Sequence, residues 1–180
     1  MIYEHCDADS FWGTTNQTRP KMDQQVNEEV VVYLDIDGVL NTSDDHTEWR
    51  TDRNSHLYRV SPYNRGDFVS NHRLSLLREW LKKHDAKVVI ISSWVVLRDT
   101  GKMICDFLEL PYHSEAYDTG GGKSRGTGVL RHVADHNIHR WVVLDDAKCM
   151  HDHDEVLLRH LVHIRGGLNE SYLEEADFIL

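Results

Sequence analysis

The sequence predicts an α/β protein built on a Rossmann-like, doubly wound parallel sheet with a minimal cap. Short runs rich in β-branched residues recur without alternation, as expected of strands that are covered on both faces. Segments with apolar residues at helical spacing lie between these runs, and such alternation is typical of parallel sheets with right-handed crossovers. We expect the strands at 30–34, 87–91 and 141–144, with a weaker one at 161–164.

The helical segments have recognisable starts and ends. The clearest has Leu74, Leu77 and Leu81 on one face, Ser70 or Asn71 as its N-cap, and a basic last turn. Pro111 stops a shorter one. The helices are expected at 70–84, 101–110, 128–137 and 154–161, with a final helix after Leu168.

Length and composition limit the organisation of the chain. Its 180 residues suffice for one ordinary domain, which we place at 28–180, preceded by an N-terminal arm at 1–27 that is polar and without sustained period. No window is apolar enough for a membrane span. The acidic N-terminus lacks the regions of a signal peptide, and three scattered cysteines fit a reducing compartment, so a cytoplasmic location is expected.

The strands that are expected at 30–34, 87–91 and 141–144 end in polar side chains. These are Asp35 and Asp37, Ser92 and Ser93, and Asp145 and Asp146. Because the reactive site of such a sheet lies outside the carboxyl ends of its strands, four carboxylates are expected to converge there. Like charges repel at short range, so the cluster needs a cation or a retained proton. Mg²⁺, which prefers oxygen ligands and accompanies phosphates, is the natural partner.

These residues resemble a known family. "YLDIDGVLN" resembles motif I of the haloacid dehalogenase (HAD) superfamily, "VVIISSW" motif II, "GKSRGTGVL" the basic motif III and "WVVLDD" the acidic motif IV, in the family order. The resemblance covers about residues 28–180, and the HAD group found in Swiss Army Knife RNA repair proteins is the most similar. That group usually has Arg directly after the Trp of motif II, where this chain has Val95.

The resemblance implies a role for each motif residue. Asp35 is expected to be the nucleophile that forms an aspartyl-phosphate, and Asp37 the general acid and then base. Ser92, with Ser93 as alternate, would hold a phosphoryl oxygen, and either Lys123 or Arg125 would neutralise it. Mg²⁺ would be held by Asp35, by the backbone carbonyl of Asp37 and by Asp146, which we prefer to Asp145 as the direct ligand.

The implied function is a Mg²⁺-dependent phosphomonoester hydrolase, acting on nucleic-acid ends or nucleotides. The space between motif I and the next helix allows a flap at 41–69 but no cap domain, and an open site admits bulky substrates. Guanidinium and aromatic groups in the flap suit phosphate contacts and base stacking: Arg50, Arg53, Arg59 and Arg65, with Trp49, Tyr58 and Tyr63. An ordinary polar loop whose aromatics pack on the sheet is equally compatible. The net charge of -10 confines any nucleic-acid contact to the flap and to 123–131.

Two other functions remain open, namely a small-metabolite phosphatase and a catalytically silent HAD-shaped binding protein. The oligomeric state is not predictable. Three further motifs do not indicate a function. "GGGKS" (120–124) lacks the first glycine of a P-loop. "HVADH" (132–136) lacks the Glu of a zinc helix, so its histidines are expected at solvated positions. "HDHDE" (151–155) is expected to be a polar loop that starts a helix rather than a metal site.

Overall fold

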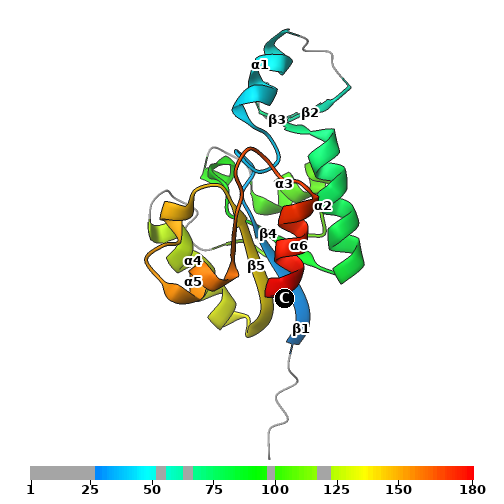
Figure 1. Cartoon of the computed structure of the whole chain (residues 1–180). Coiled ribbons are helices and arrows are strands. Elements are labelled where there is room, and N and C mark those ends of the chain that lie inside the picture. The colour runs from blue at the N-terminus through cyan, green and yellow to red at the C-terminus, as the bar shows by residue number, and fades with distance from the viewer. Residues whose placement is uncertain (1–26, 52–55, 63–66, 97–99, 117–122) are drawn as a thin grey trace, which may run out of the picture.

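The computed structural model describes residues 27–51, 56–62, 67–96, 100–116 and 123–180 (Figure 1). Its centre is a four-stranded sheet in the order β4-β1-β5-β6, in which every neighbouring pair is parallel. The strands are β1 (Asn27–Leu34), β4 (Lys87–Ile90), β5 (Ile138–Asp145) and β6 (Leu161–His163). All four predicted strands are therefore confirmed. The predicted arm lies outside the described residues except for Asn27, which begins β1.

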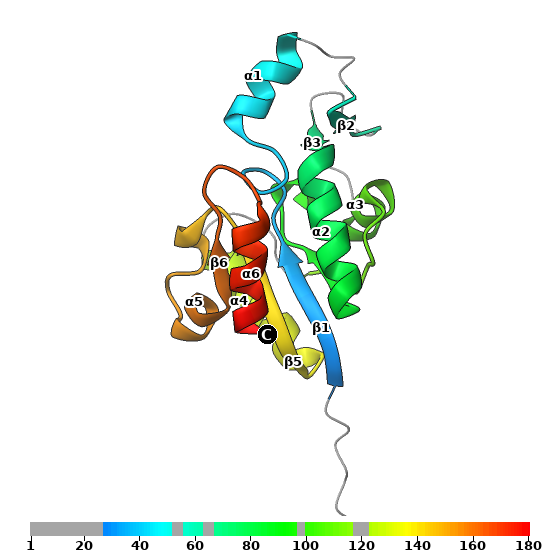
Figure 2. The same ribbon diagram turned by 45° about the vertical axis from the view of Figure 1, so that its right-hand side comes forward.

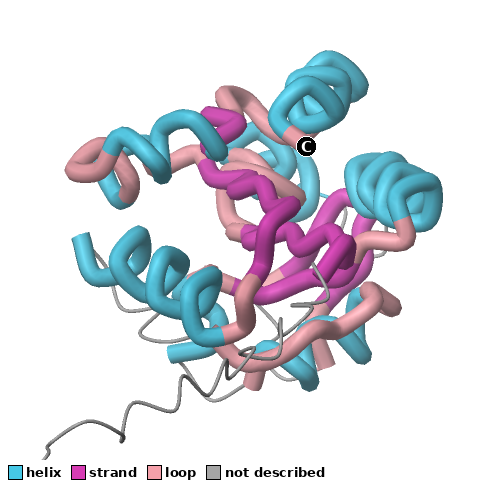
Figure 3. Tube along the Cα trace, turned by 90° about the horizontal axis from the view of Figure 1, so that it is seen from below, coloured by secondary structure: helices cyan, strands magenta, loops and turns pink. Residues whose placement is uncertain are grey.

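Helices cover both faces of the sheet (Figure 3). Buried side chains place α2 (Asn71–His84), α3 (Gly101–Leu108) and α6 (Glu170–Ile179) on one face. On the other face lie α4 (Lys123–Asp135) and α5 (Glu155–His160). The doubly wound α/β prediction is therefore correct. Among the described helices, none is long and apolar enough to cross a membrane.

The buried runs of the sequence are explained by this two-sided packing. Along β1, Val30, Val32 and Leu34 pack toward α2 and α6, whereas Val31 and Tyr33 pack toward α4. All five side chains are at most 2% exposed. A strand without a polar face is what a central position in a covered parallel sheet requires.

Some helix boundaries differ from the sequence prediction. Ser70 is the N-cap of α2, since its hydroxyl accepts a hydrogen bond from the N–H of Arg73 at 3.5 Å. Helix α4 begins at Lys123, five residues earlier than the apolar spacing indicated, so the motif III residues lie in its first turn instead of preceding the helix. Helix α5 ends at His160 and strand β6 follows directly, so Leu161 is a strand residue.

The order of the strands determines where a site can form. From β1 the chain crosses to β4 on one side, and it then returns to β5 on the other side of β1. A crevice opens beyond the carboxyl ends of strands where the winding reverses in this way. The chain thus brings the ends of β1 and β5, with their aspartates, to the same crevice.

The described residues of an insertion at 42–70 lie beyond the carboxyl end of β1 (Figure 2). The insertion contains α1 (Ser43–Thr51) and an antiparallel pair, β2 (Tyr58–Val60) and β3 (Phe68–Ser70). Trp49 stacks on Phe68 with ring centroids 4.9 Å apart, and Tyr58 meets the same ring edge-on at 5.2 Å. The insertion corresponds to the predicted flap and has a small aromatic core of its own.

Candidate active site

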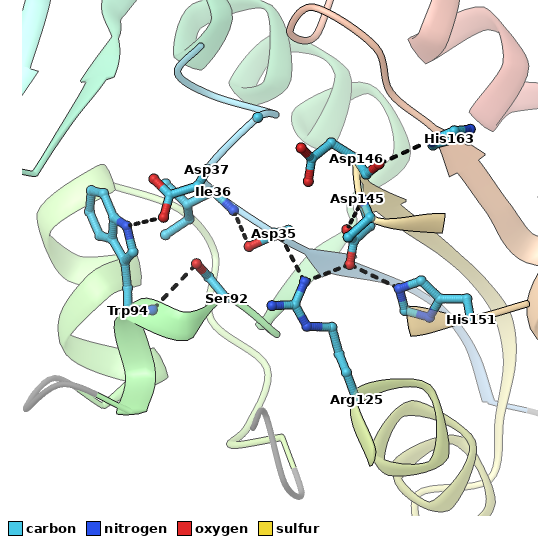
Figure 4. Close-up of polar contacts among 12 residues, drawn as sticks. Asp35, Ile36, Asp37, Ser92, Trp94, Arg125, Asp145, Asp146, His151 and His163 are labelled. Carbon is cyan, nitrogen blue, oxygen red and sulfur yellow. Dashed lines mark hydrogen bonds and ion pairs between the residues drawn. The ribbon is translucent and has the colours of Figure 1, made fainter. Parts of the chain in front are cut away.

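Asp35 and Asp37 leave β1 in different environments (Figure 4). Asp35 is only 5% exposed, and its backbone N–H still donates to the Leu144 carbonyl of β5 at 3.0 Å. Ile36 points into the apolar core and is fully buried. Asp37 is exposed, so the chain presents one buried and one open carboxylate at the same strand end.

Arg125 connects the two strand ends. One of its guanidinium nitrogens, Nη1, donates to Asp35 at 2.8 Å and to Asp145 at 2.9 Å. Arg125 is 6% exposed and Asp145 is fully buried, so this ion-pair network is shielded from water. A buried carboxylate pair would repel strongly without a cation between its members. Among the described side chains of motif III, Arg125 thus contacts both strand ends.

Burial raises the pKa of Asp35 to about 6, and the charge of Asp145 adds to this effect. Arg125, the Ile36 N–H, which donates to Asp35 at 2.8 Å, and a hydrogen bond from the Ser92 hydroxyl act in the opposite direction. Ser92 is fully buried whereas Ser93 is exposed. Of the two serines in motif II, Ser92 is therefore the one that contacts the candidate nucleophile.

Asp37 is held by side chains from two segments. The indole Nε1 of Trp94 donates to one of its oxygens at 3.1 Å, and the amide of Asn41 donates to the other at 2.9 Å. Asn41 also donates to the Phe68 carbonyl of the insertion at 3.0 Å. The carboxylate is therefore oriented toward the crevice while it remains accessible to solvent.

Both oxygens of Asp145 accept hydrogen bonds. Oδ1 accepts from the Ala147 N–H at 2.7 Å, and Oδ2 accepts from Arg125 and from Nε2 of the buried His151 at 2.9 Å. The carboxylate can only accept, so Nε2 must carry the proton of this contact. Burial alone would raise the pKa of Asp145, but these donors outweigh it and the pKa is lowered.

Asp146 is the exposed member of the acidic cluster. Oxygens of Asp35, Asp145 and Asp146 lie within 4.8 Å of one another, the only such group of possible metal ligands among the residues that the structure describes. A Cβ on Gly38 would come within 2.1 Å of Asp146 Oδ2, so this carboxyl packs directly against the Gly38 backbone. Partial burial and the charge of Asp145 raise the pKa of Asp146. Hard carboxylate oxygens with excess negative charge fit Mg²⁺.

The sequence did not reveal every residue of this site. Trp94 and Asn41 hold Asp37, and His151 holds Asp145, and the sequence analysis predicts none of these three contacts. The conspicuous "SSW" and the histidine shortly after "LDD" were the available signals. Lys123 begins α4, but its side chain is outside the described part of the structure. Val95 packs against the apolar core, and Arg98 is also outside the described residues.

The structure tests the predictions for the two histidine motifs, "HVADH" and "HDHDE". His132 is fully buried, where its Nδ1 contacts the Tyr33 hydroxyl at 2.8 Å and its Nε2 the Ser114 hydroxyl at 2.6 Å. The predicted solvated position is therefore wrong for His132, because its helix face packs on the sheet, and correct for the exposed His136. In "HDHDE", Asp154 caps α5 as predicted, but His151 is buried rather than part of a polar loop.

The predicted nucleic-acid surface of the flap is not supported by its described members. Trp49 and Tyr58 are buried around Phe68, so their rings are not open for stacking. Arg59 donates to the Phe107 carbonyl at 2.7 Å and pairs with Glu109 at 2.9 Å. These aromatics are packed, as the alternative expected, but around Phe68 of β3 and not on the central sheet, and the segment contains a helix and a strand pair instead of an ordinary loop. The Arg50 side chain, Arg53, Tyr63 and Arg65 lie outside the described residues.

Comparison with known proteins agrees with these motifs. Residues 31–175 match the family described as the HAD domain in Swiss Army Knife RNA repair proteins. No curated protein and no solved structure matches the chain significantly. The matched segment contains every strand of the sheet from Val31 onward and all of the acidic residues of the site.

Proposed function

Because the chain belongs to the HAD family found in Swiss Army Knife RNA repair proteins, we propose that it is a Mg²⁺-dependent phosphomonoester hydrolase that acts through an aspartyl-phosphate. A HAD-type hydrolase acting on a phosphorylated substrate is what membership suggests. The contact between Asp35 and Arg125 is the observation that carries the proposal, since it gives a buried carboxylate a cationic neighbour in a crevice. An anionic nucleophile can then approach an anionic phosphate.

In the first step a carboxylate oxygen of Asp35 attacks phosphorus. The bond between phosphorus and the leaving oxygen breaks, and Asp37 transfers its proton to that oxygen. In the second step Asp37 accepts a proton from water as the water oxygen attacks phosphorus, which releases inorganic phosphate and restores Asp35. The exposed position of Asp37, with both oxygens held by Trp94 and Asn41, supports this double role.

Arg125 and Ser92 would act on the phosphoryl group. Arg125 neutralises charge that develops on the phosphoryl oxygens, while its contact with Asp145 keeps the guanidinium in place. The Ser92 hydroxyl lies beside Asp35 and would donate to a phosphoryl oxygen. We therefore assign the motif III role to Arg125 rather than Lys123.

Mg²⁺ would be held by Asp35, by the Asp37 backbone carbonyl and by Asp146. Asp146 is favoured over Asp145 because Asp145 is fully buried and accepts three hydrogen bonds, whereas Asp146 is exposed. Asp145 then acts by orienting Arg125. When bound, the cation offsets the charge of the carboxylates and polarises the phosphoryl group.

Nucleic-acid ends or nucleotides remain our candidate substrates, because the described chain has an insertion of limited size and no cap domain over the crevice. A small-metabolite phosphatase is the rival.

A cytoplasmic location also stays a prediction, which rests on the unpaired thiols of Cys105 and Cys149.

An aryl phosphate assay tests the proposed activity. Turnover of p-nitrophenyl phosphate should require Mg²⁺, stop with EDTA and be lost in Asp35→Asn, whereas Asp44→Asn on the exposed side of α1 should keep it. Acid trapping of the radiolabelled protein should capture a phosphoenzyme in wild type only. Absence of turnover with every phosphate ester in a panel of oligonucleotides, nucleotides and sugar phosphates would instead support the binding protein.

A further inference from the structure

A cavity of about 520 Å³ opens beside the candidate catalytic residues. Its lining includes Asp37 and Asp146 from the site, residues 41–43 and His46 from the start of the insertion, and residues 164–166 from the loop after β6. Cavities of roughly 300–1,000 Å³ are typical of small-molecule sites. This cavity can therefore receive the leaving group of a substrate whose phosphate lies at Asp35.

Arg165 supplies the positive charge of this lining. Its side chain is exposed, and its guanidinium has no hydrogen bond or ion pair to any other described residue. The other described arginines around the crevice already form ion pairs. Arg73 pairs with Asp45, and Arg125 pairs with Asp35 and Asp145. Arg165 is charged at all relevant pH values and lines the same cavity as Asp37 and Asp146, so its guanidinium is available for an anion.

The backbone at Arg165 is held firmly. Its N–H donates to the Tyr172 hydroxyl at 3.0 Å, and that hydroxyl donates to the Arg165 carbonyl at 3.1 Å. Three positions further on, the Leu168 N–H donates to the Val39 carbonyl at 2.9 Å, which ties the loop to the segment that follows Asp37. Little ordering of the loop is then needed when a ligand binds.

The other groups of the lining suit a sugar and a base. Asn41, Thr42 and Ser43 offer short polar side chains. The His46 ring meets Phe68 edge-on with centroids 4.6 Å apart, which fixes its plane beside the cavity. Hydroxyl groups of a ribose and the flat face of a base are complementary to such a lining.

We propose that Arg165 binds an internucleotide phosphate in the leaving group, so that the site selects an oligonucleotide end that carries a terminal phosphate. This inference rests on the proposed function, because the terminal phosphate must lie at Asp35. It assigns substrate selection to the loop after β6 instead of the arginines and aromatics of the flap. A nucleoside monophosphate or a sugar phosphate has no second phosphate for Arg165 to contact.

Calorimetry on the Asp35→Asn protein separates binding from turnover. The probes are dinucleotides with a 3′- or a 5′-terminal phosphate, compared with inorganic phosphate. Adding Arg165→Ala should weaken binding of the preferred dinucleotide about tenfold, as expected for loss of an arginine–phosphate contact, and change phosphate binding by less than about twofold. Arg165→Lys should keep part of the affinity. The matched control is Arg140→Ala, an exposed arginine on β5 at the far end of the sheet.

Three results would overturn the inference: dinucleotides that bind no more tightly than inorganic phosphate, an Arg165→Ala protein that loses affinity for both probes equally, or one that loses none. Failure of the proposed function has a different signature. Wild-type protein would then not turn over p-nitrophenyl phosphate with Mg²⁺, while the calorimetric comparison would still report whether Arg165 recognises the second phosphate.

Discussion

Arg125 donates a 2.8 Å hydrogen bond to Asp35 from the first turn of α4, ninety positions further along the chain. The same nitrogen also contacts Asp145, so one guanidinium joins the ends of β1 and β5. The contact has two consequences. It compensates a buried negative charge in the folded protein, and it directs a cation to the atom that we propose attacks phosphorus.

Replacing Arg125 by Met should therefore affect stability and activity together. Leaving buried carboxylates without their cation should lower the free energy of unfolding by about 3–5 kcal/mol. Loss of the charge at the phosphoryl group should reduce kcat by roughly 100-fold or more. Urea unfolding and aryl phosphate turnover measure the two effects. The control is Arg131→Met on the same helix, whose guanidinium forms an exposed pair with Asp135. Equal losses in both variants would contradict a special role of Arg125.

His151 should act on catalysis through Asp145. His151→Ala removes one of the donors that hold Asp145, so Arg125 loses a fixed anchor. We expect kcat to fall about tenfold while KM for p-nitrophenyl phosphate changes by no more than about twofold, as is common when an indirect partner is lost. His151→Gln keeps an N–H donor and should recover part of the rate. The control is His139→Ala, an exposed position on β5. If His151 had a merely structural role, His151→Gln would not recover any of the lost kcat.

The strands and the acidic edge were predictable from sequence because their physical causes are local. A strand covered on both faces needs an uninterrupted apolar run, and carboxylates directly after two such runs must meet when the strands are parallel. The starts of α2 and α5 follow from Ser70 and Asp154, whose side chains bond to nearby backbone N–H groups. Motif order then sufficed to select Asp35, Ser92 and Asp146 as candidates.

The remaining features depend on contacts between distant segments. Trp49 is the sole apolar residue of helix α1, so no apolar spacing marks this helix. Trp49 and Tyr58 are buried because both pack against Phe68, which lies on strand β3, further along the chain of the insertion. The choice of Arg125 depends on where α4 begins, and that start precedes the first apolar position of the helix. The spacing of apolar residues along the sequence does not reveal these contacts between distant segments.

Gly38 should be required for the position of Asp146. An alanine Cβ there would lie 2.1 Å from Oδ2 and 2.3 Å from Cγ of Asp146, so the carboxylate must move. Gly38→Ala should weaken Mg²⁺ binding about tenfold, in the range for a displaced ligand, when measured by calorimetry.

Gly166→Ala is the matched control for that experiment. Gly38 and Gly166 have nearly the same positive φ, 78° and 77°, so alanine should cost each about 1 kcal/mol of stability through backbone strain. At Gly166, however, an added Cβ meets nothing within 4 Å. Mg²⁺ affinity should therefore fall in the first variant only, and a similar fall in both would attribute the effect to strain alone.

His132 should make the folded protein less stable in mild acid. Burial, with the nearby His136 and His113, lowers the pKa of His132 from 6.5 to about 4. Between these values the unfolded chain binds a proton that the folded chain does not, so stability falls as the pH drops through this window. For His132 alone, this linkage amounts to about 2 kcal/mol between pH 7.5 and pH 5.

Urea unfolding at both pH values, with His132→Asn beside the exposed His136→Asn, isolates this effect. The amide that replaces the imidazole in His132→Asn cannot titrate, so this variant should lose less stability than wild type on acidification. It should nevertheless be less stable than wild type at pH 7.5, because the contacts with Tyr33 and Ser114 are altered. The His136→Asn protein should retain most of the pH dependence. If the His132 variant kept the full pH dependence of wild type, the proton taken up on unfolding would have to belong to another group.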